Sequence, residues 1–131
     1  MGSYNPKDYW ERRLKSSFTL ESVGNIVFDA NYNKYLYKLQ IDVLKRAIEK
    51  SRVSLSGAKV LDIGCGTGFF SEFYIRHSAD VTGIDITDVS IESLRRGLPE
   101  GRFIVMDISA GDLKNQFAEL FDVLNVFNVL Y

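Results

Sequence analysis

Three glycines at alternate positions follow an aspartate in the segment 60–68. This segment reads VLDIGCGTG, with Gly64, Gly66 and Gly68 spaced two apart and Asp62 two residues before the first of them. Glycine adopts positive φ at little cost and leaves the backbone bare, so a ligand can approach it closely. An apolar strand precedes the three glycines and an apolar helix follows them, which is the setting in which glycine turns bind nucleosides and phosphates. The alternative is a turn that only joins a strand to a helix.

The spacing of the glycines distinguishes between cofactors. Dinucleotide-binding turns have the pattern GxGxxG, whereas this segment has GxGxG. The carboxylate of Asp62 would repel a pyrophosphate and would attract cationic groups such as a sulfonium and an ammonium. We therefore predict S-adenosyl-L-methionine (SAM) as the cofactor, bound beside Asp62 and Cys65. A nicotinamide-dependent oxidoreductase is the less favoured alternative.

Two further aspartates stand at the ends of later apolar runs. Asp85 lies 17 residues after Gly68, where a carboxylate can accept hydrogen bonds from both hydroxyls of a ribose. At Asp107 a carboxylate could accept from an adenine amino group, and the N–H of Ile108 could reach a ring nitrogen. The alternatives are a helix cap at Asp85, a role that we assign to Asp88 instead, and a solvated strand end at Asp107.

Alternating apolar and amphipathic stretches predict the elements that position these residues. Strands are expected at Lys59–Ile63, Asp80–Ile86, Arg102–Met106 and Phe121–Leu130, and helices at Phe69–His77, Val89–Gly97 and Asp112–Leu120. The strands begin about every twenty residues, which is typical of βαβ units and predicts a Rossmann-like parallel sheet with helices on its faces. Because the carboxyl ends of parallel strands meet at one edge, the aspartates should lie together.

The part of the chain before the first strand is rich in aromatic and charged residues. Lys34–Arg52 has apolar residues at helical spacing and should form a helix that packs on the sheet. Pro6–Leu14 is a second candidate helix, and Ser16–Asn33 has no clear period. We therefore divide the chain into an N-terminal helical segment, residues 1–57, and a cofactor-binding core, residues 58–131.

The overall composition excludes several classes of partner. The chain has 131 residues and a net charge of -1 with both signs interspersed, so we expect one domain and no nucleic-acid partner. There is no apolar run of about 18 residues that could span a membrane. A single cysteine cannot form an internal disulfide, which favours a reducing compartment and a cytoplasmic location.

With these motifs in order, the sequence resembles the class I SAM-dependent methyltransferases of the small-molecule type. Val60–Gly68 is similar to the family's first motif, Val81–Ile86 and Phe103–Ile108 to its second- and third-strand acids, and 121–131 to its fourth strand. The resemblance implies the strand order 3-2-1-4 and N-terminal helices that form a lid. The cofactor-binding residues that we predict are Asp62, Gly64, Cys65, Gly66, Gly68, Asp85, Ile86, Asp107, Ile108, Val126 and Phe127.

Within this set the resemblance implies a distinct part of the cofactor for each residue. The backbone of Gly64 and Gly66 would line the methionine part. Asp85 would hold the ribose, Ile86 would pack against the adenine, and Asp107 and Ile108 would hold the adenine edge. The backbone near Val126 and Phe127 would meet the methionine amino group.

The family's sheet has seven strands, whereas the predicted strands here number four. We therefore expect the N-terminal portion of a methyltransferase, ending after the fourth strand, whose apolar edge could pair with a second copy of the chain in a homodimer. The leading hypothesis is methyl transfer to a small-molecule acceptor, and the alternative is a catalytically incomplete SAM-binding module. Displacement at a sulfonium needs mainly alignment and exclusion of water, so we assign no catalytic residue and no metal site, and place His77 at the surface.

Overall fold

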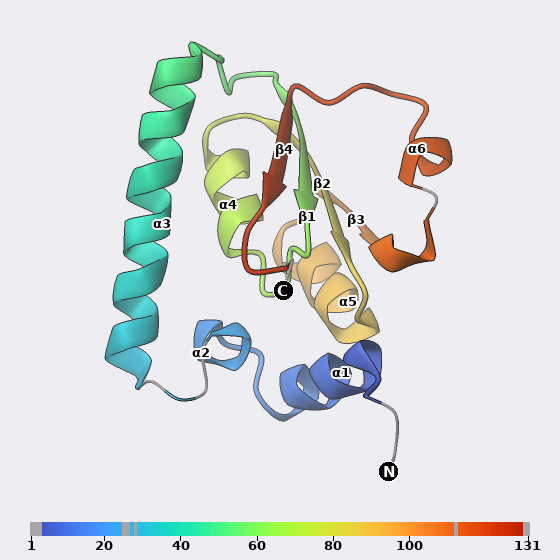
Figure 1. The fold of residues 1–131 in the computed structure, drawn as a ribbon. Helices are drawn as coiled ribbons and strands as arrows, with labels where there is room; N and C mark the ends of the chain where they lie inside the picture. The colour runs from blue at the N-terminus through green and yellow to red at the C-terminus, as the bar shows by residue number, and fades with distance from the viewer. Residues whose placement is uncertain (1–3, 25–26, 28, 112, 130–131) are drawn as a thin grey trace.

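The structure is a computed structural model that describes residues 4–24, 27, 29–111 and 113–129. Three helices precede a part of the chain in which strands and helices alternate (Figure 1). The elements are α1 (Pro6–Ser16), α2 (Leu20–Val23), α3 (Ala30–Ser51), β1 (Lys59–Ile63), α4 (Phe69–Arg76), β2 (Asp80–Asp85), α5 (Asp88–Gly97), β3 (Arg102–Val105), the 3-10 helix η1 (Ile108–Ala110), α6 (Leu113–Gln116) and β4 (Val123–Val126).

The four strands form one parallel sheet in the order β3-β2-β1-β4. This order confirms the predicted Rossmann-like topology. In the register of the central strand, Asp62 lies opposite Gly83 of β2 and Asn125 of β4. Because all strands run the same way, the glycine turn after β1 and the acids at the ends of β2 and β3 come to one edge of the sheet.

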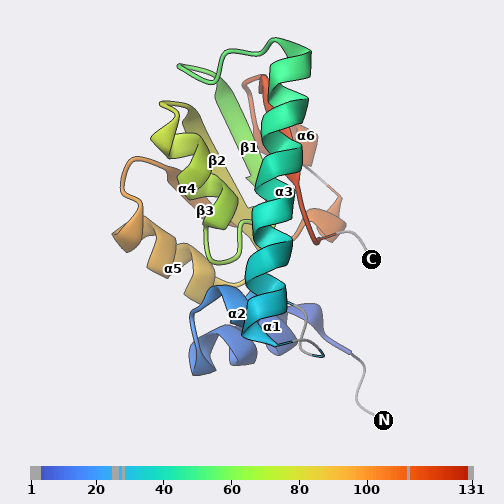
Figure 2. The ribbon, with the colours of Figure 1, turned by 90° about the vertical axis from the view of Figure 1, so that its left-hand side faces the viewer.

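Helices cover both faces of the sheet, with α4 and α5 on one face and α6 on the other (Figures 1 and 2). The side chains of β1 alternate between the two cores, as expected for a strand buried on both sides. Val60 packs with α3 and α4 through Tyr37 and Tyr74, whereas Leu61 and Ile63 pack on the α6 side. The long helix α3 runs beside β4 (Figure 2).

Two predicted helices differ from the observed ones by more than two residues at an end. The helix expected at Lys34–Arg52 starts four residues earlier, because Asp29 caps it by accepting a hydrogen bond from the N–H of Tyr32 at 2.8 Å. It ends where Arg52 adopts a left-handed conformation, with φ of 58°. The helix expected at Asp112–Leu120 is reduced to α6, and the chain after it packs Phe117 and Phe121 onto the sheet instead. Asp112 lies outside the described residues.

The fourth strand is shorter than the predicted range Phe121–Leu130. It pairs with β1 only over Val123–Val126. The chain then turns at Asn128, whose φ of 58° is incompatible with an extended strand. Leu130 and Tyr131 lie outside the described residues.

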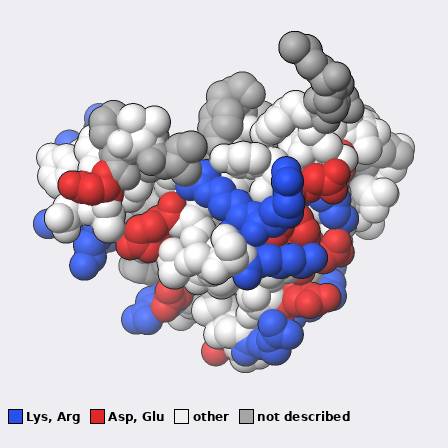
Figure 3. All heavy atoms as spheres, turned by 90° about the horizontal axis from the view of Figure 1, so that it is seen from below, with Lys and Arg blue, Asp and Glu red and all other residues white. Residues whose placement is uncertain are grey.

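The helix α1 lies below the carboxyl edge of the sheet and is attached to the start of α5 (Figure 1). Lys7 forms an ion pair with Asp88 at 2.8 Å, and Glu11 accepts a hydrogen bond from the backbone N–H of Asp88 at 2.9 Å. The prediction that Asp88 caps α5 is therefore wrong, because Thr87 occupies the cap position and Asp88 is the first residue of the helix. Seen from this side, acidic and basic side chains are mixed (Figure 3).

No helix in the described ranges is both long enough and apolar enough to cross a membrane.

Candidate functional site

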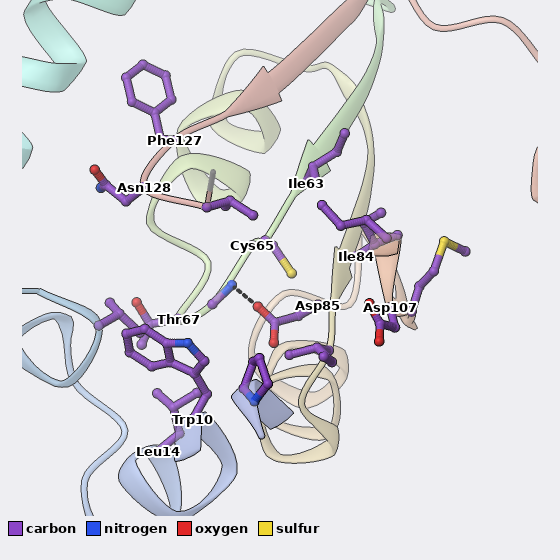
Figure 4. Close-up of a pocket in the computed structure, with 18 of the residues that line it drawn as sticks. Trp10, Leu14, Ile63, Cys65, Thr67, Ile84, Asp85, Asp107, Phe127 and Asn128 are labelled. Atoms are coloured by element: carbon purple, nitrogen blue, oxygen red, sulfur yellow. Dashed lines mark hydrogen bonds between the residues drawn. The ribbon is translucent and has the colours of Figure 1, made fainter. Parts of the chain in front are cut away.

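A cavity of about 910 Å³ lies at the carboxyl edge of the sheet, which is within the range of roughly 300–1,000 Å³ typical of ligand pockets (Figure 4). The glycine turn forms one wall, the ends of β2 and β3 form a second, and α1 approaches from below. Eight of the predicted residues line it: Gly64, Cys65, Gly66, Asp85, Ile86, Asp107, Ile108 and Phe127. The structure therefore brings together residues that are far apart in the sequence.

The glycine turn has a backbone that only glycine adopts easily. Gly64 and Gly68 have φ of 71° and 85°, in the left-handed region. A Cβ atom at Gly64 would overlap the side chain of Val129, and one at Gly68 would overlap Leu94 of α5. Gly64 thus lets the segment after β4 close over the turn. Gly68 lies outside the cavity lining and instead allows α5 to pack closely on the start of α4.

Three consecutive backbone N–H groups of the turn already donate hydrogen bonds to other groups of the protein. Gly64 and Cys65 both donate to the carbonyl oxygen of Ile84, at 2.8 and 3.0 Å, and Gly66 donates to the carboxylate of Asp85 at 2.9 Å. Turns that bind phosphate aim such N–H groups at the ligand. This turn therefore suits a pyrophosphate poorly and a ligand without phosphate well, in agreement with the spacing of its glycines.

Asp85 stands between the turn and α5, and its side chain points into the cavity (Figure 4). One carboxylate oxygen accepts from Gly66, and the other accepts from the N–H and the hydroxyl of Thr87 at 2.9 and 2.7 Å. The Asp85 carboxylate therefore does help to form the turn that leads into α5. A role of this kind, at the start of the next helix, was the alternative to a ligand role. Both roles are compatible, because each carboxylate oxygen has more than one lone pair.

Asp107 lies at the end of β3, on the same wall of the cavity as Asp85. One of its oxygens accepts from the N–H and hydroxyl of Ser109 at 2.8 and 2.6 Å. These bonds hold the pKa of Asp107 below its usual value, so the group is ionised at neutral pH. Ile86 and Ile108, which follow the two acids in the sequence, also line the cavity and add apolar surface to it.

The segment after β4 forms the wall nearest the glycine turn. Phe127 lines the cavity and stacks on Phe70 of α4, with ring centroids 4.4 Å apart. The side-chain amide of Gln40 on α3 donates a hydrogen bond to the side-chain oxygen of Asn128 at 3.1 Å. Val126, in contrast, lies outside the lining and is 38% exposed.

Asp62 lies behind the turn and does not line the cavity. Its side chain is 2% exposed, and its carboxylate accepts from the hydroxyl of Ser71 at 2.6 Å and from the amide of Asn125 at 2.8 Å. Burial raises the pKa of Asp62 to about 6, against the opposing effect of these two bonds. Any influence of Asp62 on a ligand would therefore act through its charge rather than through direct contact.

The N-terminal helices contribute lining residues that are not among the predicted cofactor-binding residues. Trp10 and Leu14 of α1 and Val23 of α2 close the cavity below the turn (Figure 4). Arg13 lies over the Trp10 ring at 5.2 Å and donates to the carbonyl oxygen of Gly24 at 2.9 Å, which ties α1 to the end of α2. The only sequence signal for this wall is the segment Tyr9-Trp10-Glu11.

The site contains no evident metal-binding group. Within the described residues, no group of three or more His, Cys, Asp or Glu side chains could hold a metal ion. His77 is exposed at the end of α4 and is not among the residues that line the cavity.

The fold and the cavity together define an α/β protein with a ligand-sized cavity at the carboxyl edge of a parallel sheet. The family model described as "Methyltransferase domain" matches residues 60–131. The chain belongs to this family, and the predicted membership of the class I SAM-dependent methyltransferases is confirmed.

Curated relatives match part of the chain. A ubiquinone biosynthesis O-methyltransferase from Pseudomonas entomophila is 38% identical over 81 residues, which are 60% of this chain and 35% of the relative. One from Xylella fastidiosa is 53% identical over 51 residues, which are 38% of this chain and 21% of the relative. The matched part of the chain thus spans about a third or less of the length of these relatives.

Solved structures share the fold over most of the chain. Magnesium protoporphyrin IX methyltransferase from Synechocystis, with bound SAM, has a TM-score of 0.66 at 18% identity and covers 95% of this chain and 62% of its own. A TehB-like SAM-dependent methyltransferase from Corynebacterium glutamicum has a TM-score of 0.54 at 26% identity and covers 92% of this chain and 54% of its own.

Proposed function

We propose that the protein binds SAM in this cavity and transfers its methyl group to a small-molecule acceptor. The observation that carries the proposal is that one cavity is lined by the glycine turn, by Asp85 and by Asp107. These residues fit the cofactor chemically: two carboxylates face the cavity, two isoleucines offer apolar contact, and the turn does not direct its donors at a phosphate. The names of the relatives and the SAM-bound neighbour support the same cofactor.

In this proposal the chain's residues bind, orient and exclude water. SAM supplies an already activated methyl group, so alignment is the main requirement. Asp85 would hold the ribose, and Asp107 with Ile108 would hold the adenine. Residues 1–57 would act as the lid, with Trp10 closing the cavity from below. A cytoplasmic location is part of the proposal and rests on the single, buried cysteine.

The alternative function is a SAM-binding module that does not itself catalyse transfer. Incorporation of a labelled methyl group into acceptors, measured on the same preparation that is used for binding, separates an enzyme from a module.

The single tryptophan provides a direct test of cofactor binding. Because Trp10 lines the cavity and contacts Arg13, we expect S-adenosylhomocysteine (SAH) to change its fluorescence saturably, and NAD to have no effect at the same concentration. Calorimetric titration of the Trp10→Phe variant is the control that does not depend on the fluorophore. A folded protein that gave neither a fluorescence change nor heat with SAH would contradict the proposal.

We also propose that two copies of the chain pair through the free edge of β4. Among the described residues, this strand is bonded to β1 on one side only, and Leu124 is 64% exposed. Sedimentation velocity should detect a concentration-dependent dimer. The variant Leu124→Lys, which places a charge on the edge strand, should shift the equilibrium to the monomer. A monomer at every concentration of the unaltered chain would refute the pairing.

A further inference from the structure

A buried polar cluster links three elements directly behind the glycine turn. It consists of Asp62 on β1, Ser71 and Tyr74 on α4, and Asn125 on β4, and all four belong to the same face of the sheet. The Tyr74 hydroxyl donates to Asn125 Oδ1 at 3.1 Å, and Asn125 Nδ2 donates to Asp62 Oδ1 at 2.8 Å. A continuous chain of hydrogen bonds therefore runs from α4 through β4 to the carboxylate of Asp62.

The carboxylate at the end of this chain has only neutral partners. In the part of the chain that the structure describes, no lysine or arginine forms an ion pair with Asp62. The titratable groups that face it are Asp85 on β2, Cys65 in the turn and Tyr74 on α4, and β4 contributes the neutral Asn125. Burial raises the pKa of both the Cys65 thiol and the Tyr74 hydroxyl, so neither carries charge at neutral pH.

A buried charge is costly unless an opposite charge or several hydrogen bonds compensate for it. Here two hydrogen bonds compensate in part, and Asp85 adds a second negative charge nearby. A cationic ligand group at the turn would supply the missing opposite charge. The orientation of the Asn125 amide is important, because its NH2 group can donate to the Asp62 carboxylate whereas its oxygen would repel that group. The Tyr74 hydroxyl fixes this orientation by donating to the amide oxygen.

We propose that Tyr74 and Asn125 are positioning residues of the cofactor site, which hold the Asp62 carboxylate beneath the glycine turn so that its charge attracts the ammonium group of the cofactor's amino-acid end. This inference rests on the proposed function and extends it to residues that do not line the cavity. Neither residue touches the ligand space, so both act through Asp62.

Two ligands separate this role from a merely structural one. SAH carries the ammonium group, together with the carboxylate of the same amino-acid end, whereas 5′-methylthioadenosine lacks both but keeps the adenine and ribose. At pH 7, Tyr74→Phe should weaken SAH binding roughly fivefold and Asn125→Ala roughly tenfold or more, since each loses a link to a charged group. Affinity for 5′-methylthioadenosine should stay unchanged. Tyr35→Phe, at an exposed tyrosine of α3, is the matched control and should leave both affinities unchanged.

The pH dependence gives a second readout. Protonation of Asp62, whose pKa is about 6, should weaken SAH binding as the pH falls. Removing the Asn125 amide, or the Tyr74 hydroxyl that orients it, should raise the pKa of Asp62, so in Asn125→Ala and Tyr74→Phe the loss of affinity should begin at a higher pH.

The stability of the protein without ligand should depend on the same proton. The folded chain binds the Asp62 proton more tightly than the unfolded chain does, so this proton stabilises the fold most below pH 4, and the stabilisation is lost as the pH rises through about 6. In the variants this loss should extend to higher pH. Asp62→Asn should abolish both trends.

The outcomes are distinguishable. Two results would overturn the positioning role while leaving SAM binding intact. One is equal weakening of the binding of SAH and of 5′-methylthioadenosine. The other is a loss of SAH affinity that begins at the same pH in the variants as in the unaltered chain. Failure of the folded, unaltered chain to bind either ligand would overturn the proposed function together with this inference. The pH dependence of thermal unfolding requires no ligand, and an unchanged profile in Tyr74→Phe would count against the inference independently.

Discussion

Gly64→Ala is expected to lower the affinity for SAH by roughly 5- to 150-fold, the range that corresponds to an overpacking cost of about 1–3 kcal/mol. The added Cβ would meet two obstacles. The φ of 71° is strained for any residue with a side chain, and the atom would overlap Val129 in the segment that closes over the turn. The wall of the cavity would have to move before the ligand could bind.

The matched control for this variant is Gly57→Ala. Gly57 has a similar φ of 75°, but a Cβ there would meet nothing within 4 Å, and the residue does not line the cavity. Both variants should therefore lose a similar amount of stability from backbone strain, of the order of 1–2 kcal/mol. Only Gly64→Ala should lose affinity. Equal affinities of the two variants in calorimetric titration would show that the turn does not contact the ligand.

The second large effect is expected at the end of β2. Asp85→Ala should weaken SAH binding by at least roughly 10- to 150-fold, the range that corresponds to the loss of a single charged hydrogen bond to the ribose diol, about 1.5–3 kcal/mol. The variant also frees the N–H of Gly66, so its melting temperature must be measured alongside. Asp80→Ala, at the exposed start of the same strand, is the control and should bind as the unaltered chain does.

A change in the ligand isolates the ribose contact from this effect on the turn. The unaltered chain should prefer adenosine to 2′,3′-dideoxyadenosine, which lacks both hydroxyls. In Asp85→Ala this preference should disappear, because the partner of the hydroxyls is gone. A preference that survives in the variant would assign the ribose to another residue.

Local patterns in the sequence were sufficient to predict the alternation of strands and helices along residues 58–131. The apolar run at Lys59–Ile63 matches β1 residue for residue, and the strands at the other acids differ only at their ends. Such runs are informative because a strand buried on both faces must be continuously apolar. The helix after β3 was predicted too long, since the packing of Phe117 and Phe121 on the sheet outweighed its helical pattern.

The glycine spacing and the order of the acids were also sufficient to predict the class of protein. A turn that needs positive φ at Gly64 and Gly68 selects glycine at those positions whatever the rest of the chain does, so the motif is visible in the sequence. The acids follow for a similar reason, because parallel strands that run in one direction deliver their carboxyl ends to one edge.

Only the tertiary structure decided which of the predicted residues line the cavity. Asp62 lies two residues from the turn in sequence, yet β-strand alternation directs its side chain to Ser71 and Asn125 behind it. Asn125 carries no local signal, because its role depends on the pairing of β4 with β1, and the place of Trp10 in the cavity wall depends on the docking of α1 against α5. Patterns of a few residues determine a turn or a strand, whereas contacts between segments distant in the chain become defined only when the chain packs.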